Sequence, residues 1–247
     1  MANDFVWFEL VTTDTAAAGD FYKTVIGWGS ELSSGPAGPY TIFKAGEIPV
    51  GGMLEMQGVP PGWLGYVGVD DVDAFAKKVE AAGGQIHKPP QDIPDVGRFS
   101  VVADPQGAMF VLFKGSLDTA PPQPAPMSPG SLAWSELHAA DWEKAFGFYA
   151  GLFGWKKHDT VPMGEMGVYQ TFGLAQAFGG MFSNHAPAPV PYWLYYFGVD
   201  GVDSAIERVK AGGGSILMGP VEVPGGAFVV NAQDPQGGIF AFLGMRG

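Results

Sequence analysis

The sequence predicts an α+β fold made by tandem duplication of paired strand–helix–three-strand (βαβββ) modules, four in all. The first observation is a repeat: the segment from Trp7 to Trp28 returns from Trp134 to Trp155, with each position displaced by 127 residues. The second is that each half contains the module order twice. The third is a segment rich in proline and alanine, residues 116–131, between the halves. Fixed spacing at many positions indicates a duplicated unit.

The module at about residues 4–57 begins with a strand predicted over 5–12. Asp14 follows and is a favourable N-cap, because its carboxylate can accept backbone N–H groups of the first helical turn. Apolar residues at helical spacing predict a helix that ends near Ile26. Three short strands, separated by glycine and proline, are predicted over 28–32, 40–45 and 50–55.

The module at about residues 62–115 repeats this order. A strand is predicted over 63–69, after which Asp71 caps a helix that ends at Gly83-Gly84. Three strands are then predicted near residues 85–88, 98–103 and 108–114. The turn Asp104-Pro105-Gln106-Gly107 joins the last two of them.

The second half is predicted to hold two more modules, at about residues 132–184 and 191–245. Its last hairpin carries the same turn, Asp234-Pro235-Gln236-Gly237, displaced by 130 residues instead of 127, so the loops absorb the difference. We predict one domain at residues 1–115, a semi-rigid linker at 116–131 and a second domain at 132–247.

Charge and composition exclude several classes of partner. The net charge is −12 with 13 lysine and arginine residues, whereas nucleic acids and anionic membranes both require a basic surface. Cysteine is absent, which excludes disulfides and thiolate metal sites. No signal peptide is recognisable, and no apolar run approaches the roughly 18 residues that span a bilayer. We expect a cytoplasmic protein, monomeric or homodimeric.

The modules resemble those of the vicinal oxygen chelate superfamily, which includes glyoxalase I, bleomycin-resistance proteins and extradiol dioxygenases. Several motifs carry the resemblance, and all have partners in the second half: Asp14 with Phe21-Tyr22 and Gly27, Val69-Asp70-Asp71-Val72-Asp73, Ala82-Gly83-Gly84, and Asp104-Pro105-Gln106-Gly107. The chain is most similar to tandem glyoxalase-like proteins whose halves begin Trp-x-Glu-Leu. The resemblance implies two clefts formed by curled mixed sheets, with helices on the outer face.

The resemblance also implies a divalent metal, held by His, Gln or Glu on the first strand of each module and by Glu on a last strand. Counting from the helix caps and the Asp-Pro turns gives the matching positions: Trp7, Leu64 and Val111 in the first half, and Trp134, Leu194 and Ala241 in the second. None of these side chains is a good metal donor. We therefore predict neither a metal site of the family type nor another cofactor.

Strand alternation predicts which side chains share the cleft-facing side. Trp7 and Glu9 share a face in the first half, and Trp134, Glu136 and His138 share one in the second. A Glu–His pair two residues apart can act as general acid and base, so Glu136 and His138 are the candidate catalytic residues. Alternatively, Glu9 and Glu136 are structural groups, since both halves carry them.

Aromatic residues concentrate on the predicted strands. Alternation places Tyr66 and Tyr196 in the clefts, where an apolar aromatic lining suits a flat or greasy ligand, whereas Trp63 and Trp193 fit a buried core. The predicted ligand-binding residues are Trp7, Glu9, Tyr66, Trp134, Glu136, His138 and Tyr196. The glycine pairs at 51–52 and 179–180 also repeat, and glycine within a strand predicts a bulge or a close approach.

These residues favour one function and leave two alternatives. The favoured one is binding of a small hydrophobic or aromatic molecule in one or both clefts, without the usual metal. The first alternative is a metal-independent isomerase, lyase or hydroxylase-like enzyme that uses Glu136 and His138 as acid and base. The second is a glyoxalase-type metalloenzyme with substitute ligands.

Overall fold

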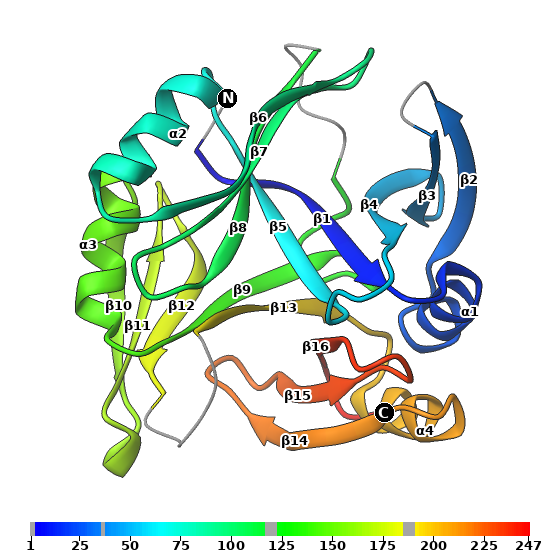
Figure 1. The fold of residues 1–247 in the computed structure, drawn as a ribbon. Coiled ribbons are helices and arrows are strands. Elements are labelled where there is room, and N and C mark those ends of the chain that lie inside the picture. The colour runs from blue at the N-terminus through cyan, green and yellow to red at the C-terminus, as the bar shows by residue number, and fades with distance from the viewer. Residues whose placement is uncertain (1–2, 36–37, 117–122, 185–190) are drawn as a thin grey trace. The chain divides into compact units, whose positions relative to one another are not determined.

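The computed structural model describes residues 3–35, 38–116, 123–184 and 191–247. These residues form two eight-stranded mixed sheets and four α-helices, which confirms the predicted α+β fold of paired βαβββ modules (Figure 1). In chain order the elements are β1 (Phe5–Thr12), α1 (Thr15–Val25), β2 (Gly29–Gly35), β3 (Gly38–Ala45), β4 (Ile48–Glu55), β5 (Gly62–Gly68), α2 (Val72–Ala81), β6 (Gln85–Ile93), β7 (Gly97–Ala103), β8 (Met109–Gly115), β9 (Leu132–Ala139), α3 (Trp142–Phe153), β10 (Lys156–Pro162), the 3-10 helix η1 (Gly164–Met166), β11 (Val168–Gly173), β12 (Ala177–Ser183), β13 (Tyr192–Gly198), α4 (Val202–Ala211), β14 (Ser215–Glu222), β15 (Phe228–Gln233) and β16 (Ile239–Gly244).

Hydrogen bonding orders the strands β2-β3-β4-β1-β5-β8-β7-β6 in one sheet and β10-β11-β12-β9-β13-β16-β15-β14 in the other. In each module the first strand pairs in parallel with the last, and the other pairs are antiparallel. The parallel register sets Glu9 opposite Gly52, and Glu136 opposite Gly180. The duplication therefore preserves a glutamate–glycine neighbour pair in both halves.

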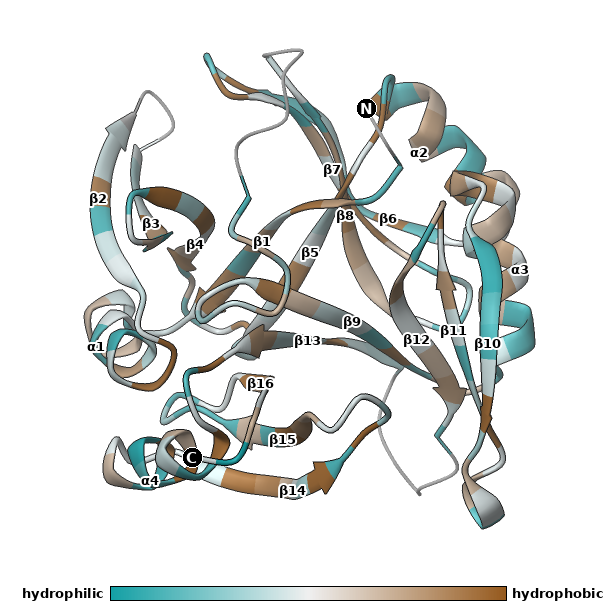
Figure 2. Ribbon diagram, turned by 180° about the vertical axis from the view of Figure 1, so that it is seen from behind, coloured by the Kyte–Doolittle hydropathy of each residue, from teal (hydrophilic) through white to brown (hydrophobic). Residues whose placement is uncertain are grey.

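The helices begin where aspartate can cap them. The side chains of Asp14, Asp71 and Asp141 each accept a hydrogen bond from the backbone N–H three residues further on, at 2.9, 2.9 and 3.1 Å. Helix α4 is the exception, since Gly201 occupies its N-cap. Hydrophilic and hydrophobic residues alternate along the helices, as expected for amphipathic helices that cover a sheet (Figure 2). Among the described residues, no helix has the length and apolarity needed to cross a membrane.

The chain forms two compact units, and each combines parts of both halves. Unit I comprises Met1–Trp7, Leu64–Ala120 and Ser135–Trp193, and it contains α2 and α3. Unit II comprises Phe8–Trp63, Pro121–Trp134 and Leu194–Gly247, and it contains α1 and α4. The boundaries proposed above for two sequential domains stay a prediction, and residues 117–122 of the predicted linker lie outside the described residues.

The core of unit I is centred on Tyr149, which is fully buried. Its hydroxyl donates to Oδ2 of Asp104 at 3.1 Å and accepts from Nε1 of Trp193 at 3.1 Å. The Tyr149 ring packs beside Phe110 of β8, at 5.6 Å between ring centroids. Phe153 of α3 stacks on Phe75 of α2 at 5.8 Å and 7°. The hydroxyl and the rings together join the second module to the third.

Unit II has the same arrangement around Tyr22, which is also fully buried. The Tyr22 hydroxyl donates to Oδ2 of Asp234 at 3.0 Å and accepts from Nε1 of Trp63 at 3.0 Å. Burial raises the pKa of Asp234, and burial followed by the Asp234 charge raises the pKa of Tyr22 well above its ordinary value. Trp63 and its counterpart Trp193 in unit I are thus core residues, as the sequence indicated.

Asp4 gives a test of pH-dependent stability. Its carboxylate accepts the Phe5 N–H at 2.7 Å, but burial dominates and raises its pKa to about 6 from 3.8. Because the fold favours the protonated carboxyl, stability should rise as the pH falls from about 6 towards 4. We expect Asp4→Asn to stabilise the protein by about 1 kcal/mol at pH 7.5, after allowance for solvent screening, and to have no effect near pH 3.5.

Urea unfolding at several pH values measures this effect. Asp20→Asn, at an exposed position of α1, serves as the control and should be neutral throughout. An Asp4→Asn gain that is independent of pH would contradict the assignment.

Candidate functional site

The predicted Glu136–His138 pair is in direct contact on β9. Both residues are largely buried, with 9% and 8% of their surface exposed. The imidazole Nε2 lies 2.8 Å from Oε1 of Glu136, and the hydroxyl of Tyr169 on β11 donates to Oε2 at 2.9 Å. Both carboxylate oxygens therefore hold a hydrogen bond, and a chain of polar groups runs from Tyr169 through Glu136 to His138.

Aromatic rings enclose the imidazole. The His138 ring stacks on Tyr192 of β13, with 4.5 Å between centroids and 19° between planes, and meets Phe182 of β12 edge-on at 4.7 Å. Phe182 in turn stacks on Tyr169 at 6.1 Å. Burial, and secondarily the charge of Glu136, raises the pKa of Tyr192, so this hydroxyl stays protonated at neutral pH. The result is an apolar aromatic setting with a small polar centre.

Gly180 allows Tyr169 to reach Glu136. A Cβ atom at Gly180 would lie 2.2 Å from Cε1 of Tyr169, so the ring lies directly on the backbone of β12. The register sets Gly180 opposite Glu136. The predicted close approach at the repeated glycines is therefore confirmed, and the group that approaches is an aromatic side chain.

The first half has the same frame, meaning a glutamate, the glycine opposite it and a tyrosine packed on that glycine, with one difference. Gly52 lies opposite Glu9, and a Cβ atom at Gly52 would lie 2.2 Å from the hydroxyl oxygen of Tyr40. The position that matches His138 is Val11, which is buried. The first copy thus keeps the glutamate, glycine and tyrosine but carries no imidazole.

The positions that match the family's metal ligands in the first half form a hydrophobic cluster. Tyr66, Phe99 and Val111 are its buried members, and Trp7 and Leu64 pack against them. These side chains offer no donor that fits a divalent metal. Within the described ranges, no three His, Cys, Asp or Glu side chains lie together as a metal site requires. The prediction that Trp7 and Tyr66 bind a ligand is untested, but the two residues do share this cluster.

The remaining predicted residues take different positions. In unit II, Tyr196 is buried and lies opposite Ala241, and Trp134 is half-buried at the start of β9. The contact of Tyr169 with Glu136 and the packing of Tyr192 on His138 were not predicted from the sequence. Tyr40 and Tyr169 recur at matching places before the repeated glycines, and this repetition was the signal available for the first contact. No sequence signal indicated that Tyr192 would pack on His138.

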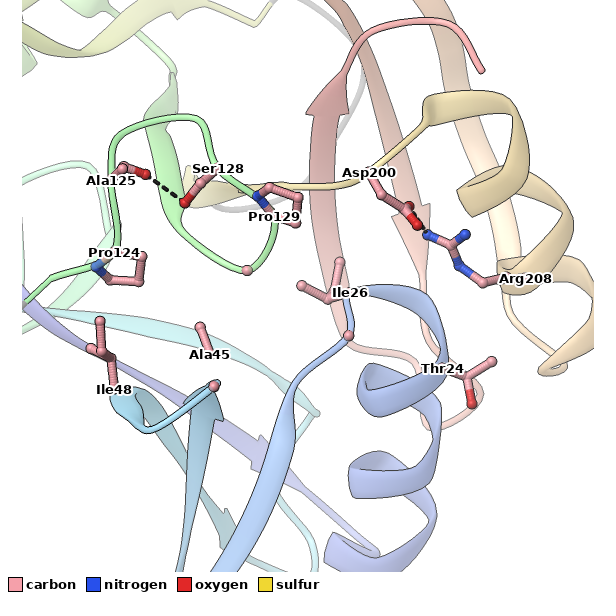
Figure 3. Close-up of a pocket in the computed structure, with 13 residues that line it drawn as sticks. Thr24, Ile26, Ala45, Ile48, Pro124, Ala125, Ser128, Pro129, Asp200 and Arg208 are labelled. Atoms are coloured by element: carbon pink, nitrogen blue, oxygen red, sulfur yellow. Dashed lines mark hydrogen bonds and ion pairs between the residues drawn. The ribbon is translucent and has the colours of Figure 1, made fainter.

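A separate pocket of about 600 Å³ lies in unit II, between the end of α1, the β3–β4 turn, linker residues 124–130 and α4 (Figure 3). Its polar side chains are occupied by neighbours. Ser128 donates to the Ala125 carbonyl at 2.7 Å, and Arg208 pairs with Asp200 at 2.6 Å. Ser128 and Arg208 in this pocket already bond to neighbouring groups, so the Glu136–His138 pair is the better candidate site.

The comparisons with known proteins agree with this architecture. The model of the Glyoxalase/Bleomycin resistance protein/Dioxygenase superfamily matches residues 4–112 and 131–242. "Putative glyoxylase CFP32" of Mycobacterium tuberculosis is 33% identical over 96% of this chain and 93% of its own length. "Anthracycline biosynthesis protein DauV" of a Streptomyces species is 32% identical over 97% of this chain and 92% of its own.

A solved structure shares the fold. The crystal structure of the Mn(II)-bound glyoxalase from Novosphingobium aromaticivorans has a TM-score of 0.68 at 20% identity, over 98% of this chain and 82% of that one. Both halves of the sequence match the family, and the paired βαβββ modules are those of the fold. The chain therefore belongs to the Glyoxalase/Bleomycin resistance protein/Dioxygenase superfamily.

Proposed function

We propose that this protein binds a small aromatic molecule at the Glu136–His138 pair and does so without a metal or another cofactor. The observation that carries the proposal is the buried pair itself, a hydrogen-bonded carboxylate and imidazole set among aromatic rings. Small-molecule sites are mostly apolar, with a few fixed polar groups that orient the ligand. We further propose that the protein acts in the cytoplasm as a monomer or homodimer.

Two further observations support an aromatic ligand. The first-half positions that match the family's metal ligands carry an apolar cluster, which favours hydrophobic contact over coordination there. In addition, a relative that aligns with nearly the whole chain is named for anthracycline biosynthesis. Anthracyclines contain fused aromatic rings, so simple hydroxyanthraquinones are suitable first probes.

Thermal unfolding with and without 2-hydroxyanthraquinone tests the proposal. A ligand at 100 times its Kd stabilises the folded state by about 2.7 kcal/mol, and we expect Tm to rise by roughly 5–10 °C in a protein of this size. Arg98→Ala should leave this rise unchanged, because Arg98 pairs with Asp73 and Asp92 at the surface. If a broad panel of aromatic compounds leaves Tm unaltered, the proposal is wrong.

A second candidate function rests on the same contact. Glu136 and His138 lie 2.8 Å apart, which is the distance at which a carboxylate orients an imidazole that transfers protons. A metal-independent isomerase, lyase or hydroxylase-like enzyme would use this pair as its acid and base. Once a substrate is identified, turnover by Glu136→Gln and His138→Ala decides the matter, since native rates in both variants exclude the role.

A further inference from the structure

The hydrogen bonds of Glu136 fix the tautomer of His138. An ionised carboxylate can only accept, so the Nε2 atom, at 2.8 Å from Oε1, carries a hydrogen. The other oxygen accepts from Tyr169 at 2.9 Å, which holds the carboxylate in place. A neutral imidazole with its hydrogen on Nε2 presents a lone pair on Nδ1. That atom is then a hydrogen-bond acceptor and a base.

The Nδ1 atom of His138 is buried, and no described residue gives it a hydrogen bond. Buried polar atoms nearly always have partners, and an unpaired one costs stability. Rotation of the ring would break its bond to Glu136. The two rings against the imidazole, Phe182 and Tyr192, are themselves only half-buried. To reach Nδ1, a ligand would have to displace one of these partly exposed rings.

We propose that Nδ1 of His138 accepts a hydrogen bond from the hydroxyl group of a phenolic ligand, so that the site selects hydroxylated aromatic molecules. This inference rests on the proposed binding function and adds the group that the ligand must carry. The aromatic part of the ligand packs among Phe182, Tyr192 and Tyr169, as those rings pack on one another. Its hydroxyl hydrogen satisfies the unpaired atom.

The charge near His138 and the difference between the two halves indicate which ligands are favoured and how many selective sites each chain has. Glu136 lies next to the imidazole, and the chain carries a net charge of −12, so a neutral phenol is favoured over an aromatic carboxylate. The first half has Val11 where the second has His138. Hydroxyl selectivity should therefore be confined to one site per chain.

A matched pair of ligands tests the proposal on the unmodified protein. Calorimetric titration with 2-hydroxyanthraquinone and with its methyl ether compares the same ring system with and without the donor. We expect the hydroxyl compound to bind at least tenfold more tightly, about 1.4 kcal/mol, with one such site per chain. Anthraquinone-2-carboxylate should bind more weakly than either.

Variants assign the selectivity to the imidazole. His138→Phe keeps an aromatic ring and removes Nδ1, so both ligands should bind with the affinity of the methyl ether. Tyr40→Phe changes the first copy and should leave the selectivity intact, as a matched control for Tyr169→Phe, which should reduce it.

Long-range ¹H–¹⁵N spectra of the four histidines should show His138 protonated on Nε2, with its Nδ1 signal shifting on addition of the hydroxyl compound.

The outcomes separate the two proposals. If neither anthraquinone binds, the proposed aromatic-binding function fails. If both bind equally well to the native protein, that function stands and the inference about His138 is overturned. Protonation of His138 on Nδ1 in the free protein would overturn it as well, even if His138→Phe does not fold.

Discussion

Replacement of Tyr149 by alanine should lower the free energy of unfolding by about 4 kcal/mol, because it removes a fully buried ring from the core of unit I. The loss has two parts. The ring contacts Phe110 and stacks on Trp155 at 5.3 Å. The hydroxyl joins Asp104 of the second module to Trp193 at the start of the fourth, so its removal leaves two buried polar groups without this partner.

Tyr149→Phe separates these parts. It keeps the ring and removes the hydroxyl, and we expect a loss of about 2 kcal/mol. Tyr22→Phe should cost a similar amount, since Tyr22 makes the same two hydrogen bonds, with Asp234 and Trp63. Tyr169→Phe, at a half-buried tyrosine, is the control and should cost under about 1 kcal/mol. Urea unfolding measures all four variants, and a loss below about 0.5 kcal/mol for both buried phenylalanine variants would show that the hydroxyl bonds are not stabilising.

The elements of the fold could be predicted because their signals are local. Asp14 and Asp71 cap helices at the expected places, and strand β1 has the expected bounds. The main difference lies in β6, which was predicted over residues 85–88 but extends over Gln85–Ile93 through two prolines. Strand β6 is at the edge of its sheet, where a residue without an N–H is tolerated.

The candidate site could be predicted only in part. Alternation along β9 placed Glu136 and His138 on one face, since that is a property of a single strand. Their partners come from other strands, and Tyr169 is 33 residues from Glu136. Which residues meet there depends on the register of β12 and on the space at Gly180. The pairing of Tyr149 with Asp104 is equally non-local: both motifs repeat in the sequence, but neither indicates that it meets its partner in the other half.

The glycine at position 180 gives the most direct test of how the fold holds the site. In Gly180→Ala the new methyl group would lie 2.2 Å from the Tyr169 ring, which must move and give up its hydrogen bond to Glu136. We expect at least a tenfold loss of affinity for 2-hydroxyanthraquinone, about 1.4 kcal/mol. We also expect about 1–3 kcal/mol of destabilisation from overpacking.

Gly52→Ala is the matched control, because the same clash arises there with Tyr40. It should cost similar stability and leave the affinity at His138 unchanged. The double variant Gly180→Ala/Tyr169→Ala removes the ring that clashes, so it should recover stability without recovering affinity. Native affinity in Gly180→Ala would mean that Tyr169 does not support Glu136. Equal losses of affinity in Gly180→Ala and Gly52→Ala would mean that the phenol binds through the frame shared by both halves rather than through the imidazole that only the second half carries.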